Sequence, residues 1–185
     1  MSTTGLDVFD KTLQTTHIWL NEIGEIVGPD KQRCYHALRA VLTTLRDRLT
    51  VDQSAHLAAE LPILVRGVFY DGYRPSDAPS AIRSQDEFVS VVAQRFGNIG
   101  PVSPRTSSIA VFKTLQRHLP QPMIEKVKGS LPQEIRVLFD VEPDTGPGAH
   151  QDTAASRSAA GERRPQDWTG AGRGATPGGS TDRNT

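Results

Sequence analysis

The side chains best suited to contact a partner or ligand lie in one short segment, residues 66–75, which reads Arg-Gly-Val-Phe-Tyr-Asp-Gly-Tyr-Arg-Pro. Tyrosine and arginine contribute much of the binding energy at protein interfaces, and Asp71-Gly72 is typical of a turn. The segment predicts a groove for a peptide or a small ligand, or, as a simpler alternative, a linker whose tyrosines pack back onto helices. The candidate surface comprises Tyr70, Asp71, Tyr73 and Arg74, with Trp19 and Tyr35 as weaker candidates.

A second pattern consists of side chains that can bind a metal ion. Asp52, His56 and Glu60 follow one another at intervals of four, which places them on one face of a helix. A polar stripe of this kind is more often a solvent-exposed face, and the His-Glu-x-x-His signature is absent. These residues are therefore only weak metal candidates, and we expect no cofactor.

The sequence lacks the arrangements that usually indicate catalysis. Cys34 and His36 are two residues apart, so on a helix they point to different sides and cannot form a thiolate–imidazole pair. No nucleophile elbow, phosphate-binding loop or dinucleotide fingerprint is found. We predict that the protein is not an enzyme and that Cys34 is a small buried apolar residue. Catalysis would need carboxylates or histidines brought together from different helices.

The elements that must position these residues are helices. Apolar residues recur at helical spacing along two stripes, and no sustained period-two alternation indicates a strand. Helix starts are indicated by Gly28-Pro29-Asp30, by the capping boxes Thr50/Gln53 and Ser84/Glu87, and by Ser103-Pro104. The first stripe comprises Phe9, Leu13, Leu20, Ile23 and Val27, and the second comprises Leu38, Leu42, Leu45 and Leu49. The predicted fold class is all-α.

The chain also matches itself at a spacing of 70 residues. Nine of the 32 positions from Leu38 to Phe69 carry the same residue 70 positions later, where about two are expected from average residue usage. This predicts two tandem repeats of about four helices each, packed as one helical domain. The expected boundaries are 6–141 for the domain, 6–73 and 84–141 for the repeats, and 74–83 for the linker.

The simplest explanation for a residue shared by both repeats is that the fold requires it. Arg66 and Arg136 are shared, and we expect each to pair with a carboxylate on a neighbouring helix. Arg48 and His118 occupy matching positions in the last turn of a helix, where a cation interacts favourably with the helix dipole. This favours a structural role for His118 over a catalytic one.

Charge and composition restrict the remaining possibilities. The 21 basic and 21 acidic residues give a net charge of +0, which argues against a strongly basic nucleic-acid binder. We expect Arg39 and the cluster Arg46-Asp47-Arg48 to lie on a solvated face with local ion pairs. Residues 142–185 contain no Leu, Ile, Val, Met or Phe, so we expect a disordered tail.

The same composition indicates where the protein resides. The first ten residues do not form a secretory signal, and no apolar run reaches the roughly 18 residues of a membrane-spanning helix. The single cysteine fits a reducing compartment, so a cytoplasmic location is expected.

Several segments resemble a known family of bacterial proteins. They are Ala-Leu-Arg-Ala-Val-Leu (37–42), Leu-Arg-Asp-Arg-Leu (45–49), Ala-Glu-Leu-Pro (59–62), Arg-Gly-Val-Phe-Tyr-Asp-Gly-Tyr (66–73) and His-Ile-Trp-Leu (17–20). They are similar to domain-of-unknown-function family 2267, over about Phe9 to Phe139. The resemblance implies an all-helical cytoplasmic protein with two related halves, and it implies no activity or catalytic residues.

Taken together, the sequence favours a non-enzymatic helical interaction module. We expect it to bind a protein partner through a groove near the hinge between the repeats, and we expect neither nucleic acid nor membrane as a partner. The alternative is a small-molecule or metal-binding sensor domain, using the hinge segment or the stripe of Asp52, His56 and Glu60.

Overall fold

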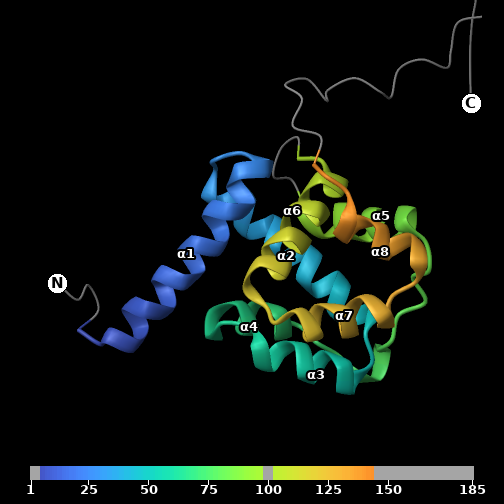
Figure 1. Cartoon of the computed structure of the whole chain (residues 1–185), viewed down its shortest axis with the longest axis horizontal. Helices are drawn as coiled ribbons and strands as arrows, with labels where there is room; N and C mark the ends of the chain where they lie inside the picture. The colour runs from blue at the N-terminus through green and yellow to red at the C-terminus, as the bar shows by residue number, and fades with distance from the viewer. Residues whose placement is uncertain (1–4, 98–101, 144–185) are drawn as a thin grey trace, which may run out of the picture. The chain divides into compact units, whose positions relative to one another are not determined.

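The computed structural model describes residues 5–97 and 102–143, and this part of the chain is helical without a strand (Figure 1). The predicted all-α fold class is confirmed for these residues. The predicted disordered tail, 142–185, lies outside the described residues except for its first two. The elements are α1 (Asp7–Val27), α2 (Lys31–Arg48), α3 (Val51–Glu60), α4 (Ile63–Tyr70), the 3-10 helix η1 (Pro75–Asp77), α5 (Gln85–Phe96), α6 (Pro104–His118), α7 (Gln121–Ser130) and α8 (Gln133–Asp140).

The structure confirms the predicted helix starts, each of which depends on hydrogen bonds between residues close together in the sequence. Asp30 accepts from the backbone N–H groups of the second and third residues of α2, at 2.9 and 3.2 Å. Thr50 and Ser84 each form a complete capping box, with Gln53 and Glu87 respectively. Ser103 accepts from the N–H of Thr106 at the start of α6. In each case a side-chain oxygen satisfies an N–H group that has no partner within the helix.

The hydrophobic core is built around α2 and α6, which pack against each other. Helices α1, α4 and α5 also pack against α2, and α1, α5, α7 and α8 pack against α6 (Figure 1). In the core Phe112 of α6 stacks on Phe139 of α8 with ring centroids 4.0 Å apart. None of the described helices is long and apolar enough to span a membrane.

Several structural details recur at the 70-residue spacing found in the sequence. Helices α3 and α7 have bounds that differ by 70, as do α4 and α8. The buried hydroxyls of Thr44 and Thr114 donate to the carbonyl oxygens of Ala40 and Ala110, at 2.7 and 3.0 Å. Corresponding residues thus have the same local environment at these positions.

The long helix α1 has two different halves. Trp19, Leu20 and Ile23 are buried, and α1 packs there against α2 and α6. The N-terminal half extends beyond the other helices in Figure 1, and Phe9 and Leu13 remain 56 % and 42 % exposed. The predicted first stripe is therefore buried only along its C-terminal part.

Candidate partner-binding surface

The segment from Tyr70 to Tyr73 is held in place by the buried side chain of Arg46. This guanidinium donates to the carbonyl oxygens of Phe69 and Asp71, at 2.6 and 2.9 Å, and pairs with the Asp47 carboxylate at 2.7 Å. The last carbonyl groups of a helix have no partners within it, and Arg46 supplies donors to the end of α4 and the following turn. Our expectation of a solvated Arg46 was wrong, since the residue is only 3 % exposed.

A second arginine of α2 contacts the same turn from the outside. Arg39 Nε and Nη2 both donate to Asp71 Oδ2, at 3.1 and 2.7 Å. Both side chains are about half exposed, so the ion pair contributes about 0–1 kcal/mol to stability. Its main consequence is geometric, because it fixes the turn after α4 against the middle of α2.

Two half-exposed tyrosines lie beside this ion pair. Tyr70 directly precedes Asp71, and Tyr35 lies one helical turn before Arg39, so each is adjacent to one member of the pair. Both tyrosines are 38 % exposed. We call the surface formed by Tyr35, Arg39, Tyr70 and Asp71 the α2–α4 patch.

The remaining predicted surface residues have different environments. Tyr73 is partly buried, and the guanidinium carbon of Arg46 lies 4.7 Å from its ring centroid. Arg74 is exposed just before η1. Trp19 was a wrong candidate for an accessible surface, because it is 1 % exposed within the core. Thus the Arg39–Asp71 ion pair joins the helix that carries Tyr35 to the segment that contains Tyr70, and Trp19 is not at the surface.

The linker between α4 and α5 is attached to the end of α2. Arg48 Nε donates to the carbonyl oxygen of Ile82 at 2.6 Å, and the N–H of Ser80 donates to the carbonyl oxygen of Asp47 at 2.6 Å. Arg95 of α5 also pairs with the Asp47 carboxylate at 2.7 Å. Arg48 therefore fixes the linker. We had expected Arg48 on a solvated face, but its side chain is partly buried against this segment.

The repeated arginines Arg66 and Arg136 have the structural role that we predicted, but with different partners. Arg66 donates to the carbonyl oxygens of Ala59 and Leu61, at 2.9 and 3.0 Å. Arg136 donates to the equivalent carbonyls of Gly129 and Leu131, at 3.2 and 2.7 Å. The expected pairing with carboxylates was wrong; both arginines instead satisfy carbonyl groups at the ends of α3 and α7.

His118 contacts α1. Its Nε2 lies 2.9 Å from Glu22 Oε2, and its ring stacks on the ring of Trp19 with centroids 5.1 Å apart. Arg117 lies 3.4 Å from the same carboxylate. As the last residue of α6, His118 has the position predicted for it, and these contacts show that it also joins α6 to α1.

The three weak metal candidates do not converge. His56 Nδ1 lies 3.4 Å from Asp52 Oδ2, and both side chains are largely exposed. Within residues 5–97 and 102–143, no three His, Cys, Asp or Glu side chains form a group that could hold a metal ion. Asp52, His56 and Glu60 therefore lie on an exposed helix face in the described structure.

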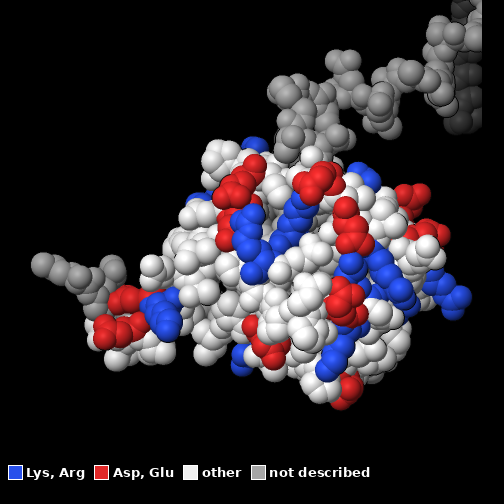
Figure 2. All heavy atoms as spheres, viewed as in Figure 1, with Lys and Arg blue, Asp and Glu red and all other residues white. Residues whose placement is uncertain are grey.

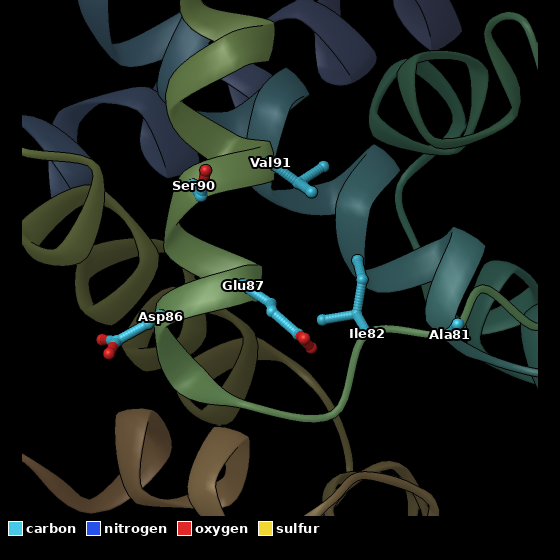
Figure 3. A pocket seen from close by; sticks show the side chains of 6 residues that line it. All are labelled: Ala81, Ile82, Asp86, Glu87, Ser90 and Val91. Atoms are coloured by element: carbon cyan, nitrogen blue, oxygen red, sulfur yellow. The ribbon is translucent and has the colours of Figure 1, made fainter.

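An open hollow of about 520 Å³ lies between the linker and α5 (Figure 3). Ala81, Ile82 and Val91 give it an apolar lining, and its two carboxylates point in different directions (Figure 3). Hydrogen bonds from the backbone N–H groups of Arg83 and Ser84 lower the pKa of Glu87. The same hydrogen bonds make Glu87 part of the capping box at the start of α5.

Cys34 is buried, as predicted. Its Sγ lies 3.3 Å from the carbonyl oxygen of Gly28, and burial raises the pKa of the thiol. The raised pKa reduces the fraction of reactive thiolate at neutral pH.

Comparison with known proteins yields one family. Residues 16–138 match the family described as "Uncharacterized conserved protein (DUF2267)". The match covers α2 to α7, most of α8 and the C-terminal part of α1, which holds its buried residues. No curated protein matches the chain.

Proposed function

Because the chain belongs to the DUF2267 family of uncharacterised conserved proteins, we propose its function from its surface: a non-enzymatic helical module that binds a protein partner through the α2–α4 patch. The observation that carries this proposal is the pair of half-exposed tyrosines beside the Arg39–Asp71 ion pair. Tyrosine and arginine are enriched among the residues that dominate interface energetics.

The contacts beneath the patch support a binding role. Arg46 fixes the end of α4 and the following turn, and the ion pair connects this turn to α2. A surface held in this way loses little conformational entropy when a partner binds. The exposed charges are also balanced, with one arginine and one aspartate, which suits a partner of mixed polarity.

Two further parts of the proposal concern organisation. We infer that the two halves are copies of one four-helix unit, within the boundaries predicted from the sequence. The matching bounds of α3 and α7 and of α4 and α8 support this, as do the matching bonds of Arg66 and Arg136. The inferred hinge is the linker that follows the patch.

A protein partner is favoured over nucleic acid because acidic and basic side chains are interspersed on the face shown in Figure 2. Binding of nucleic acid would be favoured by a concentration of positive charge. The single buried thiol fits a cytoplasmic location, which remains a prediction. The alternative small-molecule or metal-binding sensor also remains a prediction, and a thermal-shift screen with metal ions and metabolites would test it.

The experiment that tests the proposal is site-specific photocrosslinking of the full chain in its native host. A photoreactive phenylalanine analogue replaces Tyr35 or Tyr70 in two separate variants, and it replaces the similarly exposed Val137 of α8 in a control. We expect the same protein to be crosslinked from positions 35 and 70 and not from position 137.

The captured protein then allows a quantitative test. Replacing both Tyr35 and Tyr70 by alanine is expected to weaken its binding at least tenfold, since each residue of this kind contributes about 1–2 kcal/mol. Tyr73→Phe is the control, because its partly buried ring lies over Arg46. Different partners from the two positions, or unchanged binding by the folded double variant, would contradict the proposal.

A further inference from the structure

Helix α4 exposes apolar side chains on the side opposite to the one that it buries. Ile63, Leu64 and Tyr70 are 65 %, 42 % and 38 % exposed, and Gly67 is exposed between them. With about 3.6 residues per turn, these four positions fall on one side of the helix. We call the surface formed by Ile63, Leu64, Gly67 and Tyr70 the α4 outer face. It adjoins the α2–α4 patch, because Tyr70 belongs to both.

Helix α8 shows that the fold does not require apolar side chains at these positions. The four residues that lie 70 positions further along the chain are also exposed. Three of them are polar or charged, namely Gln133, Glu134 and Asp140. Single exposed apolar residues are ordinary, but an apolar cluster at positions that are polar in the equivalent helix indicates contact with another molecule.

Gly67 leaves a gap in the middle of the α4 outer face. Leu64 and Tyr70 lie three residues before and after it, so they flank the gap along the helix. A Cβ atom added at Gly67 would have no other part of the protein within 4 Å. Glycine lowers helix stability relative to alanine, so the fold gains nothing from this gap. When helices pack, side chains of one helix fill such gaps between the side chains of the other.

We propose that the partner bound at the α2–α4 patch presents an amphipathic helix, which packs along the α4 outer face. This inference rests on the proposed function and names the chemistry of the partner. The partner helix carries apolar side chains at intervals of three and four residues, and one of them fills the gap at Gly67. Where it reaches the Arg39–Asp71 ion pair, it carries an acidic residue that faces Arg39 and a basic residue that faces Asp71, since both side chains are about half exposed.

Other occupants fit this face less well. In a symmetric pair of α4 helices that overlaps along the whole face, Gly67 of one copy lies opposite Gly67 of the other, so no side chain fills the gap. The face contains neither Lys nor Arg, and Glu60 and Asp71 lie just before and just after α4. This charge distribution disfavours nucleic acid and an anionic lipid surface.

Photocrosslinking from the α4 outer face, with mapping of the crosslinked residues, tests the inference. The full chain in its native host carries the photoreactive phenylalanine analogue at position 63, beside the variants at positions 35 and 70, and at Gln133 of α8 as the matched control. We expect position 63 to capture the same protein as positions 35 and 70, and position 133 not to capture it. Because positions 63 and 70 are two helical turns apart, their crosslinks should map about seven residues apart on a helix of the captured protein. An extended segment would give a separation of about three residues.

The gap at Gly67 provides a second test, with the captured protein as the probe. Gly67→Leu fills the gap and should weaken binding of this protein at least tenfold, while thermal stability is kept or increased, because leucine favours a helix more than glycine does. Gly129→Leu of α7 is the matched control, since a Cβ atom there also has no other part of the protein within 4 Å. It should leave binding unchanged. If Gly67→Leu does not fold by circular dichroism, Gly67→Ala is used and should weaken binding at least threefold.

The outcomes separate this inference from the proposed function. If positions 35 and 70 capture one protein and position 63 does not, the inference is wrong and the proposed function stands. The same holds if the folded Gly67 variant binds as well as the natural sequence, or if the crosslinks map with the spacing of an extended segment. Capture of a second copy of this chain as the partner would also overturn the inference. If positions 35 and 70 capture no protein in common, both are wrong.

Discussion

The corner after α4 and the corresponding corner after α8 share their framework but differ in the residues that reach the surface. In both, an arginine of the last helix, Arg66 of α4 or Arg136 of α8, donates to carbonyl groups at the end of the helix before it, α3 or α7. Only the first corner has a buried arginine beneath it, because the position matching Arg46 carries Gln116. The positions matching Tyr70 and Asp71 carry Asp140, paired with Lys128, and Val141. The residues that match at the 70-residue spacing thus maintain the helices, while the residues that do not match make the two exposed corners chemically different.

The largest loss of stability is expected when the buried arginine of the first corner is removed. Arg46→Ala leaves the carbonyls of Phe69 and Asp71 without their donor and removes one partner of Asp47. We expect the free energy of unfolding to fall by about 3–5 kcal/mol, since two largely buried carbonyl groups lose a charged donor. Urea denaturation measures the change.

Gln116→Ala is the matched variant in the second half, and its expected cost is below about 1 kcal/mol. Equal losses for the two variants would mean that the corners are stabilised in the same way. The buried arginine would then not distinguish the first corner from the second.

An intermediate effect tests the shared part of the framework. Arg66→Ala and Arg136→Ala each remove a charged donor to two carbonyl groups at the end of a helix. Each should lower the free energy of unfolding by about 1–2 kcal/mol, and the two values should agree within about 0.5 kcal/mol. Parallel urea titrations provide the measurement, and a large loss in only one variant would show that the two arginines are not equivalent.

A smaller effect is expected at Tyr73, a position where the second half has Pro143. The buried hydroxyl of Tyr73 has no hydrogen-bond partner among the described residues. Tyr73→Phe should therefore leave the free energy of unfolding unchanged or raise it by up to about 1 kcal/mol, because no hydrogen bond is lost. Thermal unfolding compares this variant with Tyr70→Phe, and a clear loss of stability in Tyr73→Phe alone would contradict the expectation.

The smallest change in stability is expected at the capping boxes, of which one depends on pH and the other does not. Glu87 at the start of α5 has a pKa lowered from 4.5 by backbone N–H donors, whereas Gln53 at the start of α3 does not titrate. A carboxyl with a lowered folded-state pKa contributes stability above its unfolded pKa and loses it as the pH falls through the folded-state pKa. Glu87→Gln should thus lose stability at pH 7 and show no such loss at a pH below the folded-state pKa.

Denaturation of the natural sequence and of Glu87→Gln at a series of pH values checks this prediction. Gln53→Glu serves as the reciprocal variant, which should acquire the same direction of pH dependence. A difference between the natural sequence and Glu87→Gln that is constant from neutral to acidic pH would contradict the assigned cause.

The predictions from sequence succeeded where a feature depends on nearby residues. The capping boxes at Thr50 and Ser84 involve side chains three residues apart, so the sequence contains all the information that they need. The helical stripes were identified for the same reason, but the exposure of Phe9 and Leu13 depends on where the rest of the fold ends.

The errors concern contacts between distant segments. Arg46 was expected in solvent, although it adjoins Leu42 and Leu45, and its partners lie 23 and 25 residues further along the chain. Its position beside the apolar stripe of α2 was the available signal. Tyr35 was only a weak candidate, because the ion pair between its helix and the turn after Tyr70 joins residues 32 positions apart. The repeat correctly marked Arg66 and Arg136 as structural but contained no information about the chemical nature of their partners.

The packing of Cys34 provides a built-in reporter of conformational opening. Its sulfur contacts the turn between α1 and α2, and a Cβ added at Gly24 would lie only 3.4 Å from it. A thiol reagent can therefore reach this sulfur only when α1 separates from α2 or the protein unfolds. The rate at which a chromogenic disulfide labels the native chain will measure the frequency of that separation, without any substitution in the chain.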